Sequence, residues 1–199
     1  MWTAGPRGWV QLLSQQPARI SVVGVSGCGK TTFAPRLAAA LGLQHLQLDA
    51  LRWLPGWKRR SLDDVRSDVA QAAAAPGWVI DGNCYGTRDL VWGRATHVLW
   101  LDIAFLPVSA RVLKREVRRI WGREEPFPGC RYTWQDSFLS KHSFPRMVSN
   151  RYLGYRRHRQ EFLAAADSGR YPGIIWVQLR SQKEADRWVE EAKAWTSKA

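Results

Sequence analysis

Residues 22–32, VVGVSGCGKTT, decide the fold, because they join two segments of different periodicity. Residues 18–25 are apolar, β-branched and few, which predicts a buried strand. Residues 30–42 repeat apolar side chains at helical spacing and end at Gly42, which predicts a helix that begins at the lysine. Strand, glycine-rich turn and helix in this order are the context in which such a loop holds phosphate groups.

Residues 24–31 satisfy the pattern G-x-x-x-x-G-K-[ST]. Its glycines let consecutive backbone N–H groups turn inward around phosphates, at the positive end of the following helix. Lys30 is expected to reach the β- and γ-phosphates, and the Thr31 hydroxyl to ligate Mg²⁺. The alternative is a glycine-rich turn with an unrelated lysine. The predicted ATP-binding residues are Gly24, Ser26, Gly27, Cys28, Gly29, Lys30, Thr31 and Thr32.

Four more short apolar runs predict four further strands, at residues 45–50, 76–81, 96–103 and 173–179. Helical patterns separate them, and two of these patterns begin with a capping serine, at Ser61 and Ser181. Strands that alternate with helices predict a P-loop NTPase fold of class α/β, with a five-stranded parallel sheet between two helical layers.

Length and composition predict one domain, at residues 18–199, preceded by an N-terminal extension at residues 1–17. No apolar run approaches the roughly 20 residues of a membrane helix, and the N-terminus lacks a signal-peptide pattern. The three cysteines are widely spaced and match neither a disulfide framework nor a zinc site. Together these features predict a cytoplasmic protein without a membrane partner.

The net charge of +13 is concentrated in residues 111–159, which hold 13 Lys and Arg residues against four acids. A field of one sign attracts phosphorylated ligands, whether nucleotides or nucleic acid. A solvated helical surface would show the same pattern. The charge therefore favours phosphorylated partners but does not distinguish nucleotides from nucleic acid.

Two aspartates, Asp49 and Asp81, end predicted strands. In open parallel sheets, ligands bind at the carboxyl ends of the strands. Either carboxylate is suited to hold Mg²⁺ through water or to take a proton from an acceptor hydroxyl. Helix capping or a turn is the local alternative for both residues.

The glycine-rich loop, LDALRW at residues 48–53, WVIDGNCYGTRD at residues 78–89 and an arginine-rich helix follow one another along the chain. In order and spacing this sequence resembles the nucleoside-monophosphate-kinase-like P-loop proteins, most of all the bacterial adenylate-kinase-like or "DNA topology modulation" group. The resemblance covers residues 18–195. It implies an adenylate-kinase-like fold with an acceptor-binding insertion at about residues 50–76 and a lid at about residues 122–140.

The resemblance also implies roles for single residues. An Asp-x-x-Arg that helps bind the acceptor nucleotide in adenylate-type kinases is matched by Asp49 and Arg52, and an Asp-Gly by Asp81 and Gly82. The family's next arginine lies four residues past that aspartate, whereas Arg88 lies seven past Asp81. The acceptor residues expected on this basis are Asp49, Arg52, Trp53, Gly82, Asn83 and Arg88.

Arginines of the lid are expected to compensate the charge of the transferred phosphoryl group, and lid closure to exclude water. Trp53 and Trp57 could stack on an acceptor, although tryptophans also fill cores and interfaces. Arg156 and Arg157 lie on the helix that returns from the lid. The predicted catalytic residues are Lys30, Asp49, Asp81, Arg115, Arg119 and Arg123, and the predicted Mg²⁺ ligands are Thr31 and Asp81, the latter through water.

These expectations favour a Mg-ATP-dependent phosphotransferase, monomeric or homodimeric, that acts on a nucleotide or another small metabolite. The alternative is a nucleic-acid-binding protein in which ATP serves as a switch, of the DNA topology modulation type. The basic segment supports that alternative through weak electrostatic binding, but the sequence has no helix-turn-helix, zinc module or ribonucleoprotein signature. A kinase-like toxin or regulator that phosphorylates a nucleotide-sugar also stays open.

Overall fold

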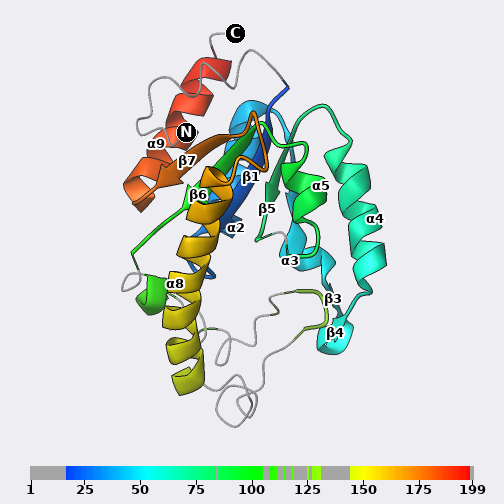
Figure 1. Ribbon diagram of the computed structural model, residues 1–199, viewed down its shortest axis with the longest axis vertical. Coiled ribbons are helices and arrows are strands. Elements are labelled where there is room, and N and C mark those ends of the chain that lie inside the picture. The colour runs from blue at the N-terminus through cyan, green and yellow to red at the C-terminus, as the bar shows by residue number, and fades with distance from the viewer. Residues whose placement is uncertain are drawn as a thin grey trace.

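The fold is seen in a computed structural model of the protein (Figure 1). The residues that it describes are 17–83, 85–104, 108–111, 114, 118, 125, 127–130 and 144–197, with side chains from residue 154 onward in the last range. The predicted N-terminal extension, apart from residue 17, and most of the predicted lid lie outside these residues. The three predicted lid arginines, Arg115, Arg119 and Arg123, lie outside them as well.

Five parallel strands form the central sheet. In spatial order they are β2 (Gln44–Gln47), β5 (Trp78–Asp81), β1 (Arg19–Gly24), β6 (His97–Leu101) and β7 (Ile175–Leu179). The register places Val22 of β1 beside Asp81 and Gly24 beside Leu101. The ends of β5 and β6 therefore flank the glycine-rich loop that follows β1, and the predicted five-stranded parallel sheet is confirmed.

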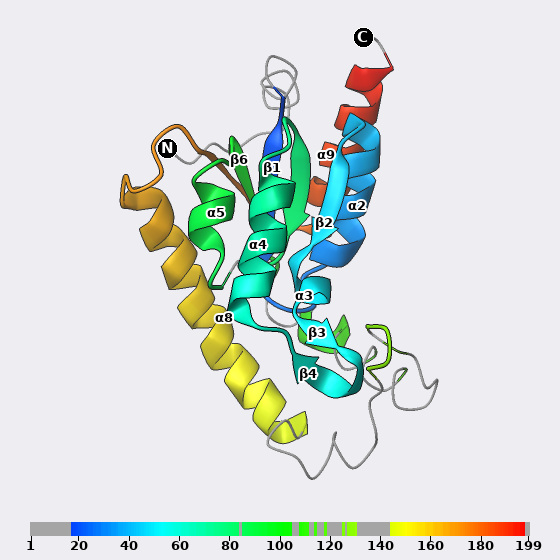
Figure 2. The same cartoon turned by 90° about the vertical axis from the view of Figure 1, so that its right-hand side faces the viewer.

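Helices cover both faces of the sheet (Figures 1 and 2). One face carries α2 (Lys30–Leu41) and α9 (Gln182–Thr196), and the other carries α4 (Leu62–Ala73), α5 (Arg88–Trp92) and α8 (Phe144–Asp167). Each helical layer buries its own apolar cluster against the sheet, so the predicted three-layer arrangement is also confirmed. Among the helices described, none has the length and apolar character needed to cross a membrane.

Local sequence signals set the ends of several helices. The Ser61 hydroxyl accepts a hydrogen bond from the Asp64 N–H at 3.1 Å, and the Ser181 hydroxyl accepts one from the Glu184 N–H at 3.2 Å. Gly42 ends α2 in the left-handed conformation, with φ 65°. All three signals had been read from the sequence, and the structure confirms them.

The second predicted strand, at residues 45–50, is wrong at its end. β2 stops at Gln47, and a short helix, α3 (Leu48–Leu51), begins at the next residue. Leu48 turns inward and packs against Gly82, where an added Cβ would lie 2.9 Å from the Leu48 Cβ. Asp49 therefore lies in the first turn of α3 rather than at the end of a strand. A hairpin follows, made of β3 (Trp53–Leu54), the turn Pro55–Trp57 and β4 (Lys58–Arg59).

Burial of His97 in β6 makes the stability depend on pH. The residue is 3% exposed, and burial lowers the pKa of His97 from 6.5 to about 4. The unfolded chain therefore gains a proton between pH 6.5 and 4 that the folded protein does not. Because of His97 alone, we expect the free energy of unfolding to fall by up to about 3 kcal/mol as the pH drops from 6.5 to 4.

The variant His97→Asn tests this expectation, because its amide stands where Nδ1 of His97 contacts the Thr96 hydroxyl at 2.8 Å but does not titrate. Urea unfolding should show a smaller loss of stability from pH 7 to pH 4.5 in the variant than in the wild type. An equal loss in the two proteins would contradict the assignment.

Candidate active site

The loop between β1 and α2 has the backbone of an anion site. Gly24, Gly27 and Gly29 have φ angles of 149°, 89° and 105°, which side-chain-bearing residues rarely adopt. A Cβ at Gly24 would lie 2.8 Å from the carbonyl oxygen of Leu101. No side chain caps α2, because its N-cap is Gly29, so the first N–H groups of the helix are available to a phosphate.

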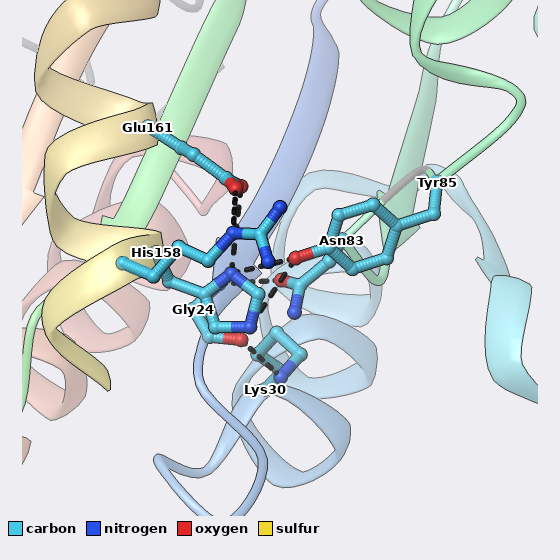
Figure 3. A network of polar contacts seen from close by, with 7 residues as sticks. Gly24, Lys30, Asn83, Tyr85, His158 and Glu161 are labelled. Carbon is cyan, nitrogen blue, oxygen red and sulfur yellow. Dashed lines mark hydrogen bonds and ion pairs between the residues drawn. The ribbon is translucent and has the colours of Figure 1, made fainter. Parts of the chain in front are cut away.

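Lys30, the first residue of α2, is 8% exposed and lies across this loop. Its Nζ donates a hydrogen bond to the carbonyl oxygen of Gly24 at 2.7 Å (Figure 3). It donates a second one to the carbonyl oxygen of Val25 at 3.1 Å. A phosphate held by the loop would compete with these two carbonyl oxygens for the ammonium group of Lys30. Thr31 and Thr32 follow with exposed side chains at the start of the helix.

Cys28 differs from the other loop residues because its side chain is fully buried. The Sγ atom packs against Gly24, where an added Cβ would lie 2.8 Å away from it. The backbone N–H donates to the Val25 carbonyl at 3.2 Å. The thiol therefore belongs to the core, and it helps to explain why residue 24 is a glycine.

The end of β5 places two polar side chains beside the loop. Asp81 is 2% exposed, and its Oδ2 lies 3.3 Å from Nε2 of His45. Asn83 Oδ1 accepts the backbone N–H of Gly24 at 3.1 Å, which ties the end of β5 to the start of the loop (Figure 3). Asn83, predicted as an acceptor residue, thus also anchors the glycine-rich loop.

A pocket of about 150 Å³ brings together residues from α3, α4 and the connection between β5 and α5. Its lining consists of Leu48, Asp49, Arg52, Val65, Asn83, Tyr85 and Thr87. Within the described part of the chain, the carboxylate of Asp49 and the guanidinium of Arg52 have no side-chain partner. Two unpaired charges of opposite sign on one short helix are suited to a polar ligand. Three of the predicted acceptor residues therefore meet here.

Arg88, another predicted acceptor residue, directly follows the pocket residue Thr87 in the sequence. Its guanidinium packs on aromatic rings. Its guanidinium carbon is 4.4 Å from the centre of the Trp92 ring and 5.8 Å from that of Tyr85. Its Nε and Nη2 atoms are buried and find no hydrogen-bond partner among the described residues. Burying such donors without a partner is costly, so a hydrogen-bond acceptor brought within reach of them would be favoured.

Trp53 and Trp57 lie in the β3–β4 hairpin and are not among the side chains that line the described pocket. Their rings meet edge to face with centroids 5.4 Å apart, and Trp57 meets Phe127 in the same way at 6.4 Å. The guanidinium carbon of Arg59 lies 5.5 Å from the centre of the Trp53 ring. The aromatic pair therefore packs within the hairpin and against residue 127.

Residues 127–130, from the predicted lid, lie against this hairpin. The Gly56 N–H donates to the Gly129 carbonyl at 2.9 Å, and the Cys130 thiol donates to the Leu54 carbonyl at 3.3 Å. Gly129 has φ 71°, and a Cβ there would lie 2.7 Å from Pro55. The structure thus places part of the predicted lid directly on the predicted acceptor-binding insertion.

Sequence reasoning missed Asp102, which follows β6 as Asp81 ends β5. Its side chain is 5% exposed and accepts hydrogen bonds from Tyr155 and Arg159 of α8, each at 3.2 Å, and from Gln178 of β7 at 2.6 Å. The rule that pointed to Asp81, a carboxylate at the carboxyl end of a strand, would have found Asp102 as well.

No family model matches the sequence, and a search of curated proteins finds no match. Similar solved structures include a shikimate kinase from Bacteroides thetaiotaomicron, with a TM-score of 0.51 and 15% identity over 90% of this chain and 98% of that one. A sugar kinase from Janibacter sp. HTCC2649 has a TM-score of 0.48 and 21% identity, over 91% and 95% of the two chains. A gluconokinase from Sinorhizobium meliloti has a TM-score of 0.45 and 17% identity, over 92% and 93%. The protein therefore shares the α/β fold of the shikimate kinase.

Proposed function

We propose that this protein is a Mg-ATP-dependent phosphotransferase that moves the γ-phosphate of ATP to a small acceptor. One juxtaposition carries the proposal: a glycine-rich loop with a buried lysine lies beside a small pocket that holds unpaired charges. The two sites share the end of β5, since Asn83 both lines the pocket and binds the loop. The fold shared with a shikimate kinase supports the same assignment.

Phosphoryl transfer depends mainly on positioning and on compensation of charge. Lys30 and the first N–H groups of α2 would bind the phosphates, while Asp49 and Arg52 would hold the acceptor. Bound Mg²⁺ would supply further charge neutralisation at the phosphates. Thr31, which is exposed at the start of α2, would supply an oxygen to that ion, and Asp81, which is buried at the end of β5, would act through a bound water. Among the described residues, no group of three or more His, Cys, Asp or Glu side chains could hold a metal ion.

The proposal is tested by ADP production from Mg-ATP with a panel of nucleoside monophosphates, sugars, hydroxy acids and simple alcohols. We expect production that depends on one class of acceptor and that disappears in Lys30→Ala. Binding of ATP without turnover on any acceptor would contradict the proposal and favour a nucleic-acid-binding ATP switch. A binding assay with DNA and RNA at two salt concentrations would then follow.

The variant Asp49→Asn separates binding from proton transfer at the acceptor. The side chain is exposed on the pocket and lacks a partner in the described structure, so we expect it to accept a hydrogen bond from the acceptor. The amide should raise the acceptor KM about tenfold, the value of one hydrogen bond to a charged group, and leave kcat within a few fold. Loss of all turnover with ATP binding retained would instead identify Asp49 as the general base.

A further inference from the structure

Tyr85 joins the wall of the acceptor pocket to α8. It lines the pocket, and its hydroxyl oxygen lies 2.6 Å from Nδ1 and 3.2 Å from Nε2 of His158 (Figure 3). The centroids of the Tyr85 and His158 rings are 5.7 Å apart. The hydroxyl of Tyr85 at the pocket is thus within hydrogen-bond distance of the His158 imidazole, which comes from a distant part of the chain.

His158 also faces the glycine-rich loop (Figure 3). Burial lowers the pKa of His158, the nearby charges of Lys30 and Arg157 lower it further, and Glu161 opposes the shift. The Glu161 carboxylate lies 3.6 Å from Nδ1. At neutral pH the imidazole is therefore uncharged and keeps a nitrogen that can accept a proton.

Tyr85 itself is a hydroxyl group at neutral pH. Burial raises the pKa of Tyr85, and Glu161 adds to the shift, against the charges of Arg88, Arg157 and Arg52. It can therefore accept one proton only while it passes its own to a base. His158 is the base within hydrogen-bond distance of it.

Contacts of other α8 residues fix the position of His158. Tyr155, three residues before it, and Arg159, the next residue, both donate hydrogen bonds to the buried carboxylate of Asp102. Phe162, one turn further on, is fully buried in the core. These contacts join α8 to the sheet on both sides of the histidine, so the ring is held toward Tyr85.

We propose that the acceptor is an alcohol and that Tyr85 and His158 take up the proton its hydroxyl loses; this rests on the proposed phosphotransferase function. The acceptor oxygen forms a bond to the γ-phosphorus of ATP as the bond to the bridging oxygen breaks and ADP leaves. The acceptor proton moves to the Tyr85 oxygen, and the Tyr85 proton moves to Nδ1 of His158. Glu161 then balances the imidazolium.

This pathway distinguishes substrate classes. A nucleoside monophosphate presents an ionised oxygen and has no proton to lose at neutral pH, whereas an alcohol is a weak nucleophile without a base. Tyr85 would be a catalytic residue, because it touches the acceptor. His158 would act through it, and Asp102 would position the helix that carries His158.

The kinetic test uses the alcohol acceptor found in the turnover panel, with kcat and KM measured from pH 5 to pH 9. Tyr85→Phe and His158→Gln should each lower kcat by about 10²-fold or more, with the acceptor KM changed only a few fold. The wild-type kcat should fall as His158 gains a proton, at a pH below 6.5, and His158→Gln should lose this acidic limb. Matched controls are Tyr171→Phe and His97→Gln, which lie outside the pocket lining. An unchanged acidic limb in His158→Gln would overturn the proposal.

A second readout needs neither ATP nor turnover. Imidazole NMR titration of the free protein should place the pKa of His158 below 6.5, and Tyr85→Phe should shift the His158 signals but not those of His97. A His158 pKa well above neutral pH would overturn the proposal, because the ring would then carry a proton at the pH of the reaction and could not accept another. Wild-type turnover with nucleoside monophosphates alone would overturn it too while sparing the phosphotransferase function. No turnover on any acceptor would remove that function itself.

Discussion

Replacement of Lys30 by alanine is expected to lower acceptor-dependent kcat by about 10³-fold, the usual scale for loss of one cation or donor at a transferred phosphoryl group. Lys30 is a cation that the structure places on the glycine-rich loop, where it donates to two loop carbonyls. Alanine removes that donor, so we expect stability to fall by about 1–3 kcal/mol. The variant should still fold, and its loss of kcat should be far larger than the unfolded fraction explains.

The measurement pairs steady-state kinetics with far-UV circular dichroism and thermal unfolding. Lys193→Ala is the matched control, since Lys193 is exposed in the last turn of α9 and its ammonium group pairs with Glu190 on the surface at 2.9 Å. Turnover in Lys30→Ala within tenfold of the wild type would contradict the assignment of the loop.

Trp92→Ala is expected to lower the free energy of unfolding by about 3–5 kcal/mol, the range found for buried large aromatic side chains. Trp92 is 1% exposed, and its ring meets those of Trp176 at 5.1 Å, Tyr171 at 5.4 Å and Phe162 at 6.3 Å. Its Nε1 donates to the Ser21 hydroxyl at 3.2 Å. Alanine would leave a cavity where α5, α8 and the sheet meet.

Trp92→Phe separates the cavity from the hydrogen bond. Phenylalanine fills most of the space but leaves the buried Ser21 hydroxyl without this donor, so we expect a loss of only about 1–2 kcal/mol. Urea unfolding should be followed by circular dichroism, because the chain has 12 tryptophans and its fluorescence mixes many sites. Equal losses in the two variants would contradict the cavity argument.

The sheet and its helices could be predicted because their signals are local. Apolar runs of four to eight residues, capping serines at 61 and 181, and Gly42 each act within a few residues of the element they define. The end of β2 could not, because Leu48 turns inward onto Gly82, a contact between residues 34 positions apart. Propensity in residues 45–50 favoured a longer strand, and tertiary packing decided against it.

The strand, glycine-rich loop and helix at residues 18–42 were predictable for the same reason, since eight consecutive residues carry the loop pattern. Part of the pocket lining was predicted, through Asp49, Arg52 and Asn83, and the role of these residues stays a prediction. Tyr85 and His158 were not predicted, because 73 positions separate them and nothing in either local stretch refers to the other. A pair of this kind becomes visible only when α8 is packed against the sheet.

The contact between residues 127–130 and the β3–β4 hairpin has a thermodynamic consequence. Two hydrogen bonds and an aromatic contact join these two segments, which come from different parts of the chain. A ligand that moves the hairpin must also move residues 127–130 or break their contacts. Conversely, a movement of residues 127–130 must alter the affinity of the protein for that ligand. Linkage requires the two effects to be equal. The affinity for such a ligand and the position of residues 127–130 are thereby two measures of one coupling free energy.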